Sequence, residues 1–197
     1  RGVGKTTFLL QYAKENFKAD DRKCLYVNMN NFYFQGRGIA DFAADFYNHG
    51  GEVLLIDQVF KQPEWSRELR LCYDHCPGLK IVFTGSSVMR LKDENPELNG
   101  IVESYNLRGF SFREYLNLLT GSNLPIYSLD DILEHHEDIA TGIIGEHHDV
   151  PEYFQSYLHH GFYPFFLEHR NFEENLLKTM NMMTEVDILL IKQIELK

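Results

Sequence analysis

The chain has 197 residues, of which 44% are hydrophobic and 24% charged, and a formal net charge of −10. This composition is that of an ordinary globular protein with room for one substantial domain and part of a second. No apolar run approaches the roughly 18 residues of a membrane-spanning helix, and no secretory leader is visible, so we expect a cytoplasmic protein without a membrane partner. The acidic charge and the scattered Lys and Arg residues argue against DNA as the main partner of this chain.

The three cysteines, Cys24, Cys72 and Cys76, are too few and too unevenly spaced for a disulfide framework. Cys72 and Cys76 are four residues apart and would share one helix face, where packing is the simpler explanation. A reducing compartment is therefore expected.

Helix-like and strand-like patterns alternate along the first half of the chain. Helical periodicity is found at residues 8–17, 39–47 and 63–76. Short apolar runs predict buried strands at 24–28, at 53–56 and within 79–87. Strands that alternate with helices indicate a parallel sheet in a three-layer α/β domain.

The third helical segment has a marked apolar face. Pro63 stands at its expected start. The face carries Trp65, Leu69, Cys72, Tyr73 and Cys76. From about Phe110 the pattern becomes mainly helical, which predicts a second unit.

Residues 2–6 read Gly-Val-Gly-Lys-Thr, the second half of the phosphate-binding motif G-x-x-x-x-G-K-[ST]. Glycines let successive backbone N–H groups surround a phosphate, and the following helix directs its positive end at the same anion. Lys5 would contact the β- and γ-phosphates, and the Thr6 hydroxyl would ligate Mg²⁺. The predicted nucleotide-binding residues of this loop are Gly2, Val3, Gly4, Lys5, Thr6 and Thr7. The first glycine of the motif and the strand before it are absent, so we expect the sequence to be part of a longer protein.

The apolar run at 53–56 leads into Asp57 and Gln58. A buried strand that ends in an acid, about 50 residues after such a loop, indicates the carboxylate on the magnesium side of a phosphoryl-transfer site. The next position usually holds a glutamate that accepts a proton from the attacking water. The Gln58 amide can orient that water but cannot accept its proton, which predicts hydrolysis slowed by about 10²–10⁴. Two alternatives stay open: another residue has taken the role, or the change was introduced to trap the ATP state.

The following strand ends in Thr-Gly-Ser-Ser at 84–87. A hydroxyl at this strand end can contact the γ-phosphate, and Ser86 is predicted as this sensor, with Ser87 as the next candidate. Small polar residues end many strands, so the motif by itself carries little information.

Together these stretches resemble AAA-type ATPases (AAA+ superclass) of bacteria and archaea, in which an ATPase core is followed by a helical lid and a winged-helix region. The similar segments are the phosphate loop, LLIDQVFKQPEWSRELRLCYD, LKIVFTGSS, YNLRGFSFREYL and YLHHGFYPFFLE. The resemblance implies a nucleotide-dependent switch or motor that uses ATP and Mg²⁺, with Lys5 and Thr6 on phosphate and metal and Asp57 as the magnesium-side acid. It further implies that Ser86 is the sensor and that Pro164, in GFYPF, lies near the base.

We therefore predict an α/β, three-layer P-loop NTPase core at residues 1–109, a smaller helical lid at 110–170, and the start of a winged-helix-like region at 171–197. A protein or DNA partner is expected to bind through a C-terminal region beyond the given sequence, and the family allows oligomers.

Two departures from the family bear on activity. Gln58 replaces the usual glutamate, and Asn99-Gly100-Ile101 stands where the family often has a serine followed by two arginines. An arginine on the γ-phosphate is worth about 10³–10⁵ in rate, so a slow ATPase or a binding-only switch is expected. Arg108 and Arg113 are candidate substitutes, although an interface with the lid is the simpler role for each.

Other features receive simpler interpretations. The histidine-rich stretches 135–138, 146–149 and 159–160 have residue types that bind metals, but neighbouring histidines on a helix point in different directions, so solvated surface is expected. The aromatic run 162–166 is assigned to a core rather than to base stacking. Arg37, in the loop at 30–38, is a candidate phosphate contact.

Three functions are compatible with these features. The first is an ATPase with weak or regulated hydrolysis, and the second is a non-hydrolysing module in which bound nucleotide rigidifies a scaffold for a partner. A small-molecule or nucleotide kinase shares the phosphate loop but lacks an evident acceptor-binding element. The assignment of the base as adenine rests on the resemblance. It is supported by the absence from the sequence of an Asn-Lys-x-Asp stretch, which would recognise guanine.

Overall fold

The computed structural model describes residues 1–85, 95–168 and 171–187. These form two compact units, which consist mainly of Val3–Leu107 and mainly of Arg108–Lys178. The predicted sensor Ser86 and its alternative Ser87 lie outside the described residues. The predicted lid and winged-helix-like assignments stay predictions.

A three-stranded parallel sheet forms the centre of the first unit. The strands, in their order across the sheet, are β1 (Cys24–Asn28), β2 (Val53–Asp57) and β3 (Lys80–Phe83). The central strand β2 is buried along its whole length, as its apolar run predicts. The predictions that β1 and β3 are buried were wrong: β1 is half-buried, and so is β3 apart from the exposed Lys80. Within the described chain each of these outer strands has a neighbour on one side only.

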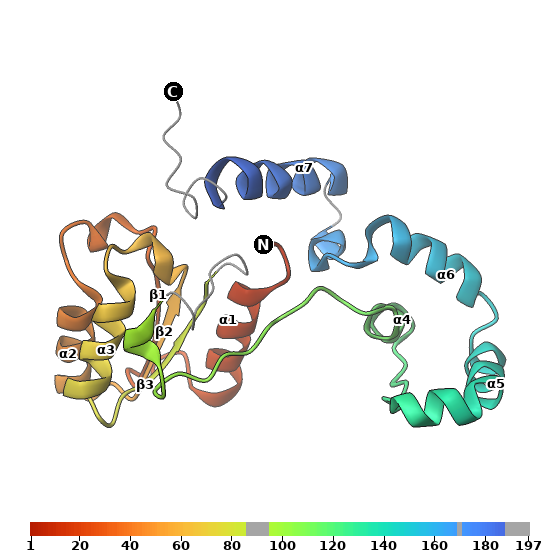
Figure 1. Cartoon of the computed structure of the whole chain (residues 1–197), viewed down its shortest axis with the longest axis horizontal. Helices are drawn as coiled ribbons and strands as arrows, with labels where there is room; N and C mark the ends of the chain where they lie inside the picture. Colours follow the sequence, from red (N-terminus) through yellow and green to blue (C-terminus); the bar gives the residue numbers. More distant parts are fainter. Residues whose placement is uncertain (86–94, 169–170, 188–197) are drawn as a thin grey trace. The chain divides into compact units, whose positions relative to one another are not determined.

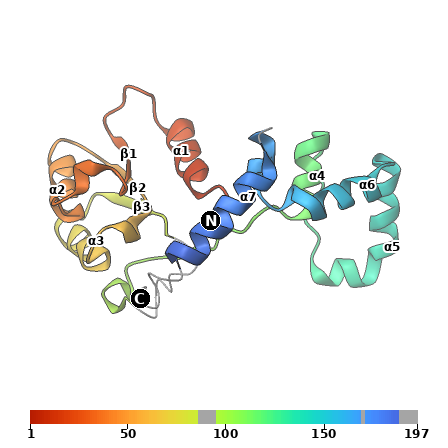
Figure 2. The same ribbon diagram turned by 90° about the horizontal axis from the view of Figure 1, so that it is seen from above.

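Helices cover both faces of this sheet, so the first unit has three layers (Figures 1 and 2). They are α1 (Lys5–Asn16), α2 (Ile39–Asn48) and α3 (Trp65–His75). Successive side chains of a strand point to opposite faces. Leu55 accordingly clusters with Leu9 of α1, whereas Leu54 clusters with side chains of α2 and α3, such as Ala43 and Leu69.

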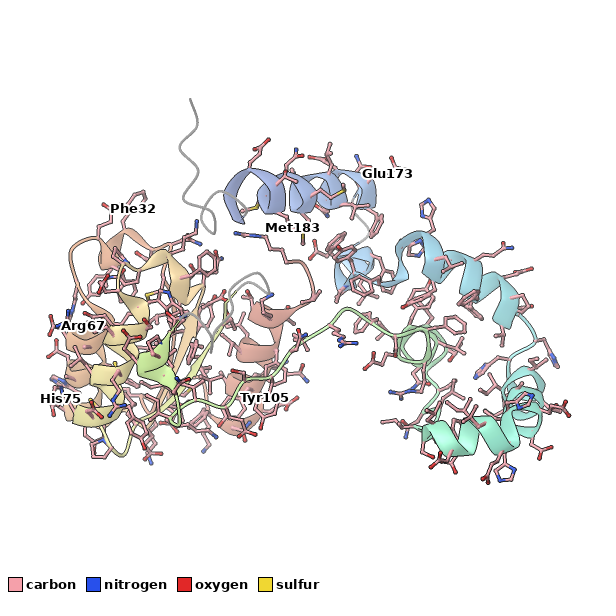
Figure 3. The ribbon with its side chains drawn as sticks, in the orientation of Figure 1. Phe32, Arg67, His75, Tyr105, Glu173 and Met183 are labelled. Carbon is pink, nitrogen blue, oxygen red and sulfur yellow. The ribbon has the colours of Figure 1, made fainter. Side chains whose placement is uncertain are left out.

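Helix α3 confirms the predicted apolar face, with two corrections. The buried residues on this face are Trp65, Leu69, Cys72 and Cys76. Tyr73 is instead 56% exposed, because a turn of 100° per residue puts it about 70° from the centre of the face. The helix begins two residues after Pro63, since Glu64 has a left-handed φ of 53°. Arg67 and His75 lie on its outer side (Figure 3).

Cys72 lies in α3 and Cys76 caps its C-terminus. Both pack in the core of the first unit, as expected. Burial raises the pKa of Cys72 to about 12 and also raises the pKa of Cys76. A thiol whose pKa is raised by burial is unreactive at neutral pH. Both residues therefore act as small apolar side chains.

The second unit is helical. Its helices are α4 (Phe112–Thr120), α5 (Leu129–Glu146), α6 (Val150–Ser156) and the beginning of α7 (Phe172–Met182). A π-helical turn at Tyr157–Gly161 and a 3₁₀ turn at Pro164–Glu168 lie between α6 and α7. None of the helices in the described part of the chain combines the length and the apolar character that crossing a bilayer requires.

Tyr115 of α4 is the centre of packing in the second unit. It is 1% exposed, and its ring centroid lies 5.5 Å from that of Tyr157 and 5.1 Å from that of Phe166. The Tyr157 hydroxyl in turn donates to the Phe110 carbonyl at 2.8 Å. The aromatic side chains of this unit therefore form its core, and Phe166 of the run 162–166 belongs to it.

Candidate functional site

The turn that precedes α1 has the backbone geometry of an anion-binding loop. Gly2 and Gly4 have φ values of 76° and 91°, in the left-handed region that glycine adopts without steric cost. Helix α1 begins at Lys5, with no side-chain cap at Gly4 and no acidic residue in its first turn. The positive end of the helix therefore meets this loop without a competing side-chain acceptor at the cap, an arrangement that suits a phosphate.

Asp57 lies at the carboxyl end of β2 and is 2% exposed. Its Oδ2 accepts a hydrogen bond from the Thr6 hydroxyl at 2.8 Å. The same oxygen accepts from the Tyr26 hydroxyl at 3.0 Å and from the Asn28 amide at 3.2 Å. Its Oδ1 accepts from the Thr84 hydroxyl. These four donors offset the cost of burying a carboxylate.

The parallel register explains why these residues meet. Asn28 is paired with Asp57 across β1 and β2, and Tyr26 lies two positions earlier in β1, hence on the same face. Thr84 directly follows β3, whose last residue, Phe83, is paired with Ile56. The carboxyl ends of the strands are where open parallel sheets bind ligands.

Gln58 turns the chain sharply out of β2. Its φ and ψ are 56° and 47°, in the left-handed region, and its backbone N–H donates to the Thr84 hydroxyl at 3.1 Å. Its carbonyl accepts from the N–H of Lys61 at 3.0 Å. A non-glycine residue in this conformation costs about 1–2 kcal/mol, so the surrounding structure must hold the turn. Thr84 thus connects Asp57 with the backbone of Gln58.

Tyr26, Asn28 and Thr84 were not among the predicted site residues. Tyr26 and Asn28 are polar residues at alternate positions near the end of an otherwise apolar strand, which is a signal that the sequence did contain. Thr84 opens the Thr-Gly-Ser-Ser stretch, in which Ser86 is the predicted sensor. Burial raises the pKa of the Tyr26 phenol, and the neighbouring Asp57 carboxylate raises it further. The phenol therefore stays protonated and acts as a donor.

The residues brought together fit a phosphate and a magnesium ion. The Thr6 hydroxyl and the Asp57 carboxylate are hard oxygen ligands, the type that Mg²⁺ prefers, and their oxygens are 2.8 Å apart. Lys5 and Thr6 begin α1, and Thr7 follows. In the parts of the chain that the structure describes, no group of three or more His, Cys, Asp and Glu side chains is arranged to hold a metal ion.

Other predicted residues lie elsewhere. Pro164 belongs to the second unit, so its role at the base stays a prediction. Arg113 of that unit donates to the Leu124 carbonyl at 3.3 Å. Arg37 pairs with Asp45 and with the Tyr33 hydroxyl, which engages the guanidinium within the first unit.

Comparison with known proteins adds one finding. A family model described as AAA domain matches residues 1–116. This range contains the phosphate loop, Asp57, Gln58 and the three residues that surround the carboxylate. No curated protein and no solved structure matches the chain.

Proposed function

The chain belongs to the AAA domain family, and from this premise we propose that it binds ATP with Mg²⁺ and acts as a nucleotide-dependent switch or motor with slow hydrolysis. The observation that carries the proposal is the 2.8 Å hydrogen bond between the Thr6 hydroxyl and the buried Asp57 carboxylate. It joins the phosphate loop to the acid at the end of the central strand. These are the two parts that phosphoryl-transfer sites of this kind need.

The residues of this chain have separate tasks in the proposal. Backbone N–H groups of the loop and the start of α1 bind the β-phosphate, and the Lys5 ammonium neutralises charge on the β- and γ-phosphates. Thr6 and Asp57 hold the metal ion. When bound, Mg²⁺ neutralises the charge that develops on the phosphates. Ser86 and Pro164 are proposed as the γ-phosphate sensor and as a contact of the adenine base.

Gln58 limits the rate in this proposal. Its amide orients a water molecule by hydrogen bonding but cannot accept the proton, and general-base catalysis typically contributes about 10²–10⁴ in rate. The 3.1 Å hydrogen bond from its backbone N–H to Thr84 fixes where its side chain starts. We therefore expect binding to be intact and turnover to be slow.

The replacement of the glutamate also favours a second function. In it the protein does not hydrolyse ATP, and bound nucleotide only organises the core and a helical lid at 110–170 for a protein or DNA partner. The residues Asn99-Gly100-Ile101, in place of the family's arginines, support this alternative as well. The free cysteines suit a cytoplasmic site of action for both functions.

The test is ATP binding and single-turnover hydrolysis by the full-length protein. Gln58→Glu and Lys5→Ala are compared with the parent, and Gln62→Glu is the matched control, because Gln62 donates to the Arg37 carbonyl outside the site. The proposal predicts that the parent binds ATP, that Lys5→Ala loses binding, and that Gln58→Glu hydrolyses at least about tenfold faster.

Each other outcome has one meaning. If Gln58→Glu is inert while Lys5→Ala still loses binding, the nucleotide serves the binding-only function. If Lys5→Ala binds ATP like the parent, the assignment of the phosphate loop is wrong and both functions fall.

A further inference from the structure

Two side chains of β1 hold one oxygen of the magnesium-side acid, and we infer that Tyr26 and Asn28 are positioning residues for the metal half of the site. The inference deepens the proposed function and rests on it. Neither residue was expected from the sequence motifs.

The two carboxylate oxygens of Asp57 are used unequally. Oδ2 accepts from three donors, on Thr6, Tyr26 and Asn28, at 2.8, 3.0 and 3.2 Å. Oδ1 accepts from the Thr84 hydroxyl. A carboxylate offers about four lone-pair sites over its two oxygens. Oδ2 is therefore saturated, and Oδ1 keeps the capacity to bind a metal ion or its water.

The donors are themselves held in place. The side-chain oxygen of Asn28 accepts from the backbone N–H of Asn30 at 2.9 Å, which turns the amide nitrogen toward Asp57. Tyr26 is half-buried in β1, and the Asn28 amide also approaches its hydroxyl at 3.5 Å. Two side chains of β1 therefore fix the orientation of the Asp57 carboxylate, although no residue of β1 is itself a predicted metal ligand.

Removing these donors frees the carboxylate to rotate away from Thr6. Outer partners that orient a metal ligand are typically worth about 10- to 100-fold in metal affinity. The phosphate loop and Lys5 lie before and at the start of α1, not in β1. The loss should therefore appear in magnesium dependence and not in metal-free nucleotide binding.

The experiment titrates a fluorescent ATP analogue onto the full-length protein, first in EDTA and then at increasing Mg²⁺. Tyr26→Phe and Asn28→Ala are compared with the parent. Tyr12→Phe is the matched control, because the Tyr12 hydroxyl accepts from Lys80 at 3.3 Å, away from Asp57. We expect unchanged binding in EDTA and a Mg²⁺ requirement raised about 10-fold or more for the two variants.

Three results would overturn the inference. A Mg²⁺ requirement equal to that of Tyr12→Phe would remove the positioning role while leaving the proposed function intact. Equal losses in EDTA and in Mg²⁺ would make the two residues structural. A parent protein that binds no nucleotide in either condition would remove the proposed function and this inference with it.

A separate observation concerns the charge of the second unit. Residues 114–168 contain ten Asp and Glu residues and neither Lys nor Arg. The chain has 29 Asp and Glu residues, so 19 remain outside this stretch, equal to its 19 Lys and Arg residues. This stretch therefore accounts for a formal charge of −10, and the rest of the chain, with 19 acids and 19 bases, is neutral on balance.

Helix α5 in this unit exposes several of its apolar side chains. It has 18 residues, none of them buried, and it is kinked at His135. Its exposed apolar side chains are Leu129 (69%), Ile132 (45%), Leu133 (67%) and Ile144 (53%). Interleaved with them are the acids Asp130, Asp131, Glu134, Glu137, Asp138 and Glu146. The kink divides α5 into parts shorter than the roughly 12–15 residues below which an isolated helix is marginally stable in water. Grouped exposed apolar residues mark interaction sites.

We propose that α5 docks an amphipathic, Lys- and Arg-rich helical segment of a protein partner. The apolar side chains supply the contact area, as in other helix-in-groove complexes, and the acids select a basic partner by charge complementarity. DNA is disfavoured because its phosphates would face a surface without a single Lys or Arg. A second copy of the chain would oppose acids with acids.

The experiment measures the anisotropy of a labelled Leu/Lys amphipathic peptide as the full-length protein is added. A Leu/Glu peptide of the same pattern and a labelled DNA duplex serve as comparison probes. Two double variants of the protein are tested. Leu129→Ser with Leu133→Ser removes apolar side chains, and Glu134→Gln with Glu137→Gln removes negative charges. Tyr73→Ser is the control, because Tyr73 is 56% exposed in the first unit.

We expect saturable binding of the Leu/Lys peptide that weakens at least tenfold in both double variants and also with added salt. Binding that survives in the double variants, or equal binding of the Leu/Glu peptide or of DNA, would overturn the proposal. So would a concentration-dependent dimer in sedimentation that Leu129→Ser with Leu133→Ser abolishes, because the occupant would then be a second copy.

Discussion

In the first unit every residue of β2 is buried between two layers of helices, whereas in the second unit α5 runs for 18 residues without a buried side chain. Residues 1–107 contain 14 acids and 13 bases, whereas residues 114–168 contain ten acids and neither Lys nor Arg. One unit is therefore stabilised by a central apolar strand. The other is stabilised by an aromatic group around Tyr115 and by local helix caps.

This difference explains where the chemistry lies. A buried carboxylate such as Asp57 needs several fixed donors, and the start of α1 together with the carboxyl ends of β1 and β3 supplies them. The second unit offers exposed side chains and charge instead, which suits recognition. The single tryptophan, Trp65, lies in the core of the first unit, so its fluorescence reports unfolding of that unit alone.

The largest effect should come from truncating a leucine in the central strand. Leu54 is 0% exposed and Leu133 is 67% exposed. We expect Leu54→Ala to lower the free energy of unfolding of the first unit by about 2–5 kcal/mol, and Leu133→Ala to change stability by less than about 0.5 kcal/mol. Urea unfolding followed by Trp65 fluorescence and by far-ultraviolet circular dichroism checks both. Equal losses would mean that α5 is packed in solution.

Two glycines of the second unit should respond with opposite signs. A Cβ at Gly161 would lie 2.4 Å from the Tyr157 ring and 2.8 Å from that of Tyr115, whereas one at Gly142 in α5 would meet nothing within 4 Å. Gly161→Ala should destabilise the second unit by about 1–3 kcal/mol. Gly142→Ala should stabilise it by about 0.5–1 kcal/mol, because alanine is the better helix former. Thermal unfolding followed by circular dichroism measures both changes. If Gly161→Ala left the stability of the second unit unchanged, the aromatic side chains around Tyr115 would be loosely packed.

The cap of α5 should have a smaller effect. The Ser128 hydroxyl accepts from the backbone N–H of Asp131 at 3.1 Å, and the Asp131 carboxylate accepts from the Ser128 N–H at 3.0 Å. Ser128→Ala should lower stability by about 1 kcal/mol, and Ser128→Thr by less. A loss of helical circular dichroism without a change in Trp65 fluorescence would place the effect in the second unit. An equal change in both signals would show that the two units unfold together.

The smallest effect concerns pH. Burial lowers the pKa of His160 from its ordinary value of 6.5, and the neighbouring His159 adds to the shift. The unfolded chain therefore takes up a proton at a higher pH than the folded chain does, so the stability of the second unit should fall as the pH drops below about 6.5. His160→Gln should flatten this dependence, while His148→Gln, at an exposed position, should not. A pH profile that is the same for both variants would contradict the assignment.

Much of the first unit could be predicted because its signals are local. Helical periodicity gave α1, α2 and α3 to within a few residues, and the apolar run gave β2 with its full burial. The phosphate loop and the acid at the end of β2 are short motifs, so the sequence alone predicts Thr6 and Asp57 as site residues, and the structure brings them to 2.8 Å.

The partial burial of β1 and β3 and the exposure of Tyr73 could not be predicted. They depend on which neighbours a segment has in space rather than on its own pattern of residues.

The sequence by itself determined the α/β class of the first unit, the phosphate loop, the acid at the end of β2 and the glutamine beside it, because each depends on residues that are neighbours in the chain. Only the tertiary structure decided that Tyr26, Asn28 and Thr84 surround that acid. These residues are 27 to 31 positions away from Asp57 in the chain. The parallel register of the strands brings them together, and a slip of one residue would destroy it.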